Sequence, residues 1–138
     1  MTKKSVYLPK NNAKDFDSWN ILKKSLDKRN VTVFCHKKEV WWCSLGLNIG
    51  FEENGKNINF ERPVLILKKF NKNMFWVLPM TSRTKENRYY YKIWYRNKYF
   101  SVILSQLRLI SDKRLLRKIW LINPDDFSKI KQLTKNLL

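Results

Sequence analysis

An arginine stands directly before a proline and an aliphatic run in the stretch RPVLIL, residues 62–67. A guanidinium group is a planar, permanently charged fork that binds two phosphate oxygens at once. Proline lacks an amide donor and has a fixed φ, so it suits the first residue of a strand and biases the preceding residue towards an extended backbone. We therefore expect Arg62 to sit on a rigid strand at the edge of a loop, where a phosphate can reach it and its long side chain need not be buried.

The other reactive residues argue against a metal centre or a nucleotide-binding loop. The only histidine, His36, and the two cysteines, Cys35 and Cys43, lack zinc-ligand spacing and a fourth ligand. We expect two buried free thiols, a peripheral structural histidine and no cofactor. Neither the GxxxxGK(S/T) nor the GxGxxG pattern occurs, and a Ser–His–Asp triad would depend on His36.

The charge balance predicts a polyanionic ligand or an acidic protein partner. The 138 residues include 29 Lys and Arg against 11 Asp and Glu, which gives a formal net charge of +18. Residues 62–118 hold fifteen basic residues and two acidic ones. A field of one sign concentrates phosphate, so a nucleic acid or another polyphosphate is the predicted ligand. Surface lysines that are merely solvated are the alternative explanation.

A basic site that lacks metal ligands suits the internal cleavage of RNA. RNA supplies its own nucleophile, the 2′-hydroxyl, so an enzyme that cuts it requires no metal. It needs a group that accepts the 2′ proton, a cation that holds the phosphate as charge builds, and a donor for the leaving 5′ oxygen. DNA lacks the 2′-hydroxyl, so this chemistry also selects the substrate.

Apolar spacing predicts an α-helix at each end of the chain. Phe16, Trp19, Leu22 and Leu26 recur every three or four residues, which predicts an amphipathic helix over residues 15–29. A terminal helix is predicted from Asn123, with Pro124 at its first position and a stripe of Phe127, Ile130, Leu133 and Leu137. A third, short helix is expected to begin at Ser111 or Asp112.

The centre of the chain predicts strands joined mostly by hairpins. The expected strands cover residues 39–45, 63–70, 73–80, 88–95, 98–110 and 118–122, and the expected loops cover 46–62 and 81–87. Such an order predicts an α+β fold, mainly antiparallel β, in which a small sheet curls into an open barrel. We find neither a signal peptide nor a membrane-spanning run and expect a cytoplasmic protein.

Five segments in order resemble the MazF/PemK family of toxins from toxin–antitoxin pairs. They are EVWWCSL, IGFEENG, ERPVLIL, VLPMTS and VILSQLRLISDKRL. The resemblance covers residues 39–138 and leaves residues 1–38, with their helix, as an N-terminal extension. It implies an SH3-like small barrel with a C-terminal helix, paired as a homodimer.

The resemblance also implies roles for single residues. Arg62 matches the family's catalytic arginine, and Thr81 matches its catalytic threonine, with Ser82 beside it. Glu52 matches the acidic residue of the glycine-containing loop, although Glu53 competes for that role. The proton acceptor and donor stay open, because Phe51 stands where some relatives have histidine.

The remaining matched residues are expected to bind RNA. Gln106 and Arg108 match a Q-x-R motif that helps to build the RNA groove or the dimer. Arg83, Lys85 and Arg88 follow the threonine and are expected to contact phosphates. The neighbouring Ser105 stands where some relatives have aspartate, another candidate for proton transfer.

The implied activity is metal-independent, sequence-specific cleavage of single-stranded mRNA, leaving a 2′,3′-cyclic phosphate and a 5′-hydroxyl. The implied partner is an acidic antitoxin, which suits a strongly basic chain. Two alternatives stay open: a gyrase-binding toxin of the same fold, and a nucleic-acid-binding module without catalysis.

Overall fold

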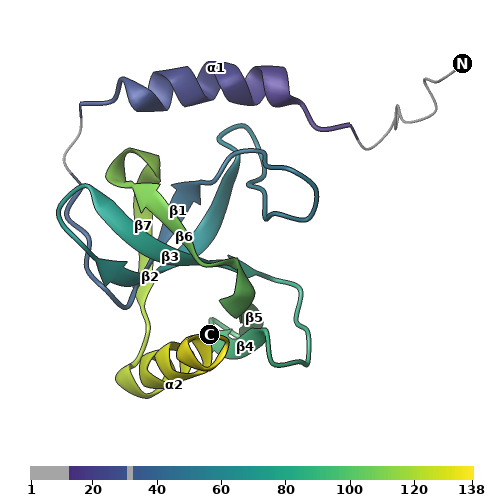
Figure 1. Ribbon diagram of the computed structural model, residues 1–138, viewed down its shortest axis with the longest axis vertical. Coiled ribbons are helices and arrows are strands. Elements are labelled where there is room, and N and C mark those ends of the chain that lie inside the picture. Colours follow the sequence, from purple (N-terminus) through teal and green to yellow (C-terminus); the bar gives the residue numbers. More distant parts are fainter. Residues whose placement is uncertain (1–12, 31–32) are drawn as a thin grey trace, which may run out of the picture.

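Two helices flank a seven-stranded antiparallel sheet in residues 13–30 and 33–138, which the computed structural model describes (Figure 1). The first twelve residues of the expected extension lie outside this range. The elements are α1 (Phe16–Asp27), β1 (Glu39–Ser44), β2 (Glu61–Lys69), β3 (Met74–Thr81), β4 (Tyr90–Tyr95), β5 (Lys98–Ile103), β6 (Arg108–Ser111), β7 (Leu115–Leu121) and α2 (Pro124–Asn136). Two short 3-10 turns, η2 (Leu104–Gln106) and η3 (Asp112–Arg114), flank β6.

The sheet curls because several strands share one central strand. The strand order is β4-β5-β3-β2-β1-β7, and β6 also pairs with β3. Bulges between Ile66 and Lys68, and twice along β1 against β7, increase the local twist. The result is the expected α+β fold, an SH3-like small barrel with a C-terminal helix and an additional N-terminal helix.

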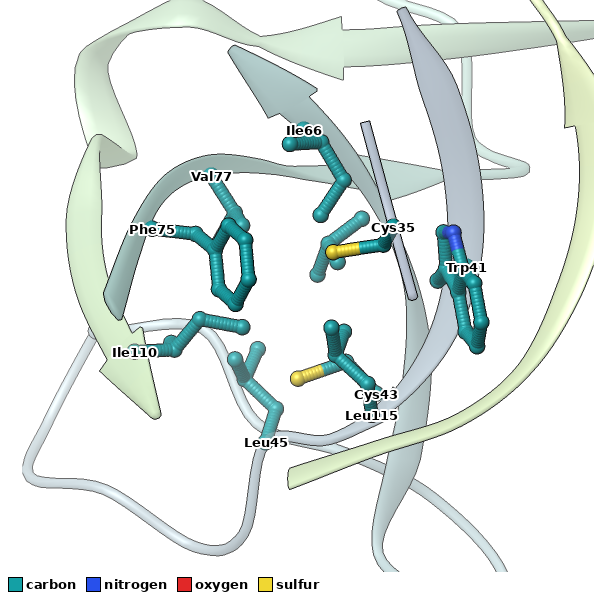
Figure 2. Close-up of a cluster of buried hydrophobic side chains, with 10 residues drawn as sticks. Cys35, Trp41, Cys43, Leu45, Ile66, Phe75, Val77, Ile110 and Leu115 are labelled. Atoms are coloured by element: carbon teal, nitrogen blue, oxygen red, sulfur yellow. The ribbon is translucent and has the colours of Figure 1, made fainter. Parts of the chain in front are cut away.

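Strand β2 is buried on both faces, which explains its unbroken aliphatic run. Val64 and Ile66 face the barrel interior, whereas Leu65 faces the core under α2. Figure 2 shows the barrel interior, where Cys35, Trp41, Cys43, Leu45, Val64, Ile66, Phe75, Val77, Ile110 and Leu115 pack together.

The two cysteines are free and fully buried, as expected. Their side chains belong to the barrel interior (Figure 2). Burial raises the pKa of Cys35 and of Cys43 to about 12, since a thiolate in an apolar core has lost its hydration. His36 is exposed at the periphery.

The helices lie at opposite ends of the barrel (Figure 1). At α2, the Asn123 side chain accepts a hydrogen bond from the Asp126 amide at 2.8 Å, and Phe127 and Ile130 bury the predicted stripe. The stripe is interrupted at Leu133, which is exposed, and resumes at Leu137, which packs against the core. No helix in the described part of the chain is both long enough and apolar enough to cross a membrane.

Three predicted boundaries are wrong, each because a distant strand decides the local structure. The loop expected over 46–62 ends two residues earlier, since residues 61 and 62 pair with β1. The strand expected over 98–110 is broken by η2, because β5 and β6 pair with different parts of β3. The helix expected from Ser111 is only the 3-10 turn η3, and Leu115, which is fully buried, already pairs with β1.

Candidate functional site

Arg62 is buried and joins three segments of the chain. Its Nε donates to the Asn54 carbonyl at 2.5 Å and its Nη1 to the Met80 carbonyl at 3.1 Å. Its Nη2 forms an ion pair with Glu53 Oε1 at 2.8 Å. The side chain is 9% exposed, so the arginine is more buried than its place at a strand end requires. Strand β2 begins one residue earlier, at Glu61, so Arg62 lies within the strand rather than in the loop before it.

The surroundings of Arg62 act on its pKa in both directions. Burial lowers the pKa of the guanidinium, Glu53 raises it, and the charge of Arg83 lowers it. A guanidinium nevertheless stays protonated at any physiological pH. Two of its five N–H donors make hydrogen bonds to the protein, and Nη2 is ion-paired with Glu53, so donors on Nη1 and Nη2 remain for a ligand.

A hollow of about 200 Å³ brings Arg62 together with Thr81 and Ser82. Thr81 is the last residue of β3 and its hydroxyl accepts a hydrogen bond from the Arg83 amide at 3.2 Å. The hydroxyl hydrogen can therefore be donated to an incoming oxygen. The lining residues are Trp42, Lys56, Asn57, Glu61, Arg62, Pro63, Met80, Thr81, Ser82, Lys98 and Phe100.

A second hollow, of about 390 Å³, lies where the loop between β1 and β2 meets Arg62, and both loop glutamates line it. Glu53 holds the arginine. Glu52, the expected acidic residue, is exposed, and its carboxylate accepts a hydrogen bond from the Ile49 amide at 3.1 Å. The sequence EENG places the two carboxylates side by side, so only the folded loop distinguishes them.

Gln106 and Arg108 line a third hollow, of about 450 Å³, together with both glutamates. Gln106 binds the loop between β1 and β2 through two hydrogen bonds. Its Oε1 accepts a hydrogen bond from the Glu53 amide at 2.7 Å, and its Nε2 donates one to the Phe51 carbonyl at 3.1 Å. Burial lowers the pKa of Arg108, and so does the charge of a neighbouring arginine. The three hollows thus adjoin one another around the loop.

The expected phosphate contacts of the loop after β3 are exposed. Arg83 lies close enough to Arg62 to act on its pKa. Lys85 and Arg88 do not line the three hollows. The Lys85 ammonium lies 5.4 Å from the centre of the Tyr90 ring, and Arg88 donates to the hydroxyl of its neighbour Tyr89 at 2.8 Å.

The structure adds site residues that the sequence interpretation missed. Lys56 and Lys98 bring two more cations to the hollow of Arg62 and Thr81, and Trp42 and Phe100 bring two rings. Lys98 looked like a turn residue, and nothing local links it to Arg62. Among residues 13–30 and 33–138, no three His, Cys, Asp or Glu side chains are grouped so that they could hold a metal ion.

The fold is a small barrel with a C-terminal helix. An arginine and a threonine lie at adjoining strand ends and line a cationic hollow. Together these features define a class of compact basic proteins. Residues 36–138 match the family model described as PemK-like, MazF-like toxin of type II toxin-antitoxin system. The chain therefore belongs to this family of toxins.

Two solved structures share the fold. The chain is similar to the crystal structure of MazF (Form-I) from Deinococcus radiodurans, with 17% identity and a TM-score of 0.64 over 76% of this chain and 96% of that chain. It is also similar to an endoribonuclease in complex with its cognate antitoxin from Mycobacterial species, with 12% identity and a TM-score of 0.55 over 75% of this chain and 93% of that chain. The comparison with curated proteins gave no match.

Proposed function

We propose that this toxin is an endoribonuclease that cuts single-stranded RNA at specific sequences without a metal ion. The observation that carries the proposal is that Arg62 and Thr81, far apart in the sequence, line one cationic hollow. Membership of the toxin family and the endoribonuclease among the similar structures support it. Its site of action is the cytoplasm, where mRNA lies.

In the proposed reaction the 2′-oxygen attacks the adjacent phosphorus, the P–O2′ bond forms and the P–O5′ bond breaks. The remaining N–H donors of Arg62 and the Thr81 hydroxyl bind the non-bridging oxygens, where negative charge grows. Glu52 is the proposed acceptor of the 2′ proton, because its carboxylate is exposed in a hollow that Arg62 also lines. The leaving 5′ oxygen takes a proton from water, and the products are a 2′,3′-cyclic phosphate and a 5′-hydroxyl.

The remaining predicted residues are proposed to guide the RNA strand. Ser82 lies in the hollow of Thr81, and Arg108 lies in the third hollow. Arg83, Lys85 and Arg88 hold flanking phosphates on one exposed loop. Gln106 is proposed to influence RNA binding indirectly, because it holds the loop through two hydrogen bonds.

The proposed protein partners are an acidic antitoxin and a second copy of the chain. A net charge of +18 favours an acidic partner. A groove of about 840 Å³ is lined by exposed apolar side chains, among them Trp76, Leu107 and Leu138, and by five lysines, Lys37, Lys68, Lys69, Lys131 and Lys135. It is the surface that we propose a second copy covers, with the lysine charges facing outward at its edge or offset by anions. Size-exclusion chromatography with light scattering measures whether the isolated chain is a dimer.

The test of the activity is incubation of the purified protein with a mixed-sequence single-stranded RNA in EDTA. We expect discrete cuts with cyclic phosphate ends, and a 2′-deoxy residue at the cut site should block the cut. Thr81→Ala should slow cleavage by about 10²–10³-fold, the effect of losing one donor to a developing oxyanion. RNA that stays intact at every salt concentration would refute the proposal, and inhibition of DNA supercoiling instead would indicate a gyrase-binding toxin.

A further inference from the structure

The N-terminal helix α1 lies outside the part of the chain that matches the family model, yet it packs on the loop of the candidate site. Trp19 is 6% exposed, and the centre of its ring lies 5.7 Å from that of Phe60. Beneath the indole lies Gly46, whose φ is +83°. A Cβ atom at this glycine would lie 2.2 Å from Cζ2 of Trp19, so only glycine permits the contact.

The residues that Trp19 contacts lie where the two ends of the loop meet. The Gly46 amide donates to the Phe60 carbonyl at 3.1 Å, and the Gly46 carbonyl accepts from the Gly55 amide at 2.7 Å. The second of these hydrogen bonds joins the two ends of residues 46–55 and so closes the loop. The indole of α1 therefore covers the point at which the loop closes.

Lys14, just before α1, also contacts the loop, at residues that lead towards Arg62. Its Nζ donates to the carbonyls of Asn48 at 2.5 Å and of Gly50 at 3.2 Å. The Asn48 amide donates to Asn54 Oδ1 at 2.6 Å, and the Asn48 side chain donates to the Glu53 carbonyl at 2.7 Å.

Residues 53 and 54 are the two loop residues that hold the guanidinium. Contacts therefore run without a gap from the N-terminal extension to the candidate catalytic arginine.

The other end of α1 is tied to the barrel. Arg29 Nη1 donates to the carbonyls of Lys113 at 2.6 Å and Leu115 at 3.1 Å, and Lys113 Nζ donates to the Asp27 carbonyl at 2.6 Å. Figure 1 shows the helix crossing the end of the barrel beside the loop between β1 and β2. A helix anchored at both ends restricts the loop beneath it.

We propose that Lys14 and Trp19 are positioning residues, and that the N-terminal helix acts as a strap that holds the loop in the shape that orients Arg62. The catalytic consequence depends on the proposed function. Because the strap orients Arg62 towards the phosphate at which charge grows in the transition state, and the flanking phosphates are held by other residues, its loss should lower kcat and leave KM nearly unchanged. The ordering of the loop is a separate consequence that does not require activity.

The first experiment measures the loop without RNA. Amide hydrogen exchange, followed by mass spectrometry, is compared between the full-length protein and its Lys14→Met and Trp19→Ala variants. Each variant should exchange residues 46–55 roughly tenfold faster, as expected from the loss of a charge-assisted hydrogen bond or a packed ring. The matched controls are Lys28→Met at the exposed end of α1 and Ile21→Ala on its exposed face, and they should exchange as the wild type does.

Gly46→Ala tests the same contact from the other side. It should loosen the loop strongly when Trp19 is present and less when Trp19 is already alanine, because the overlap with the indole has then gone. Unchanged exchange of the loop in both Lys14→Met and Trp19→Ala overturns the strap, whether or not the protein cuts RNA.

The second experiment measures cleavage. Lys14→Met should lower kcat about tenfold with KM within about threefold, and Trp19→Phe should regain most of the activity that Trp19→Ala loses. Failure of the wild type to cut RNA refutes the proposed function, while the exchange data still decide on the strap. Wild-type kcat in a variant whose loop has loosened would overturn the positioning role.

Discussion

The ion pair between Arg62 and Glu53 should contribute measurably to the stability of the barrel. The perturbation is a double-mutant cycle of Arg62→Ala, Glu53→Gln and the two combined. Arg62→Ala removes two charge-assisted hydrogen bonds to backbone carbonyls and the ion pair with the Glu53 carboxylate. Glu53→Gln keeps an acceptor oxygen beside the guanidinium but removes its negative charge.

The size of each change in unfolding free energy depends on how deeply the two charged groups are buried. A hydrogen bond to a charged group contributes about 1.5–3 kcal/mol, and water that enters the vacated site recovers part of the loss. The Glu53 side chain is 24% exposed and can be rehydrated. We expect a loss of unfolding free energy of about 3 kcal/mol for Arg62→Ala and about 1–2 kcal/mol for Glu53→Gln. Because the two effects share one contact, the coupling energy should be about 1–2 kcal/mol.

The assay is urea unfolding at pH 7 and low salt, with constant m-values as the test of two-state behaviour. Arg96→Ala, which removes the same charge at the exposed β4–β5 turn, should stay within about 0.5 kcal/mol of the wild type. A coupling energy below about 0.5 kcal/mol, the range of exposed pairs, would refute the reasoning. The result also matters for cleavage, because the activity of Arg62→Ala must be compared at equal folded fraction.

Three further outcomes are expected. Gly55→Ala should lower the unfolding free energy by at least about 2 kcal/mol, since its Cβ would lie 1.6 Å from the Phe60 carbonyl oxygen; thermal melting measures this. The thiols of Cys35 and Cys43, whose pKa values burial raises to about 12, should react with Ellman's reagent at pH 8 only after unfolding, and fast reaction of the native protein would contradict their burial. Burial and a neighbouring carboxylate raise the pKa of Tyr91 to about 12, so the folded state keeps a proton that the unfolded chain releases near pH 10. Stability should therefore fall by about 1 kcal/mol, after solvent screening, as the pH rises from about 10 to 12, and Tyr91→Phe should abolish that fall.

The helix ends and one hairpin turn follow from neighbouring residues alone. The Asn-Pro start of α2 supplies a side-chain cap and a proline whose missing amide costs nothing at that position. The turn at Arg96 and Asn97 adopts positive φ values of 48° and 61°, the backbone that joins two strands most tightly. Local chemistry is enough in such places because the partners are within a few residues of each other.

The family was also within reach of the sequence, since the order of RPVLIL, PMTS and SQLRL does not depend on the folded state. The same order placed Arg62 with Thr81, and the structure brings both to one hollow. Their catalytic roles are still predictions that the cleavage assay must test.

Tertiary contacts decided the rest. Which glutamate meets Arg62 depends on how Gln106 and Asn48 fold the loop, and these residues lie up to 53 positions from Glu53. The burial of the guanidinium depends on the Met80 carbonyl of another strand. Residues 115–117 form a strand in spite of a helix signal, because pairing with β1 buries Leu115, and long-range pairing outweighs a local preference of a few tenths of a kcal/mol. The sequence by itself thus determined the family and the local turns and caps. The surroundings of Arg62 form only when distant segments of the chain pack together.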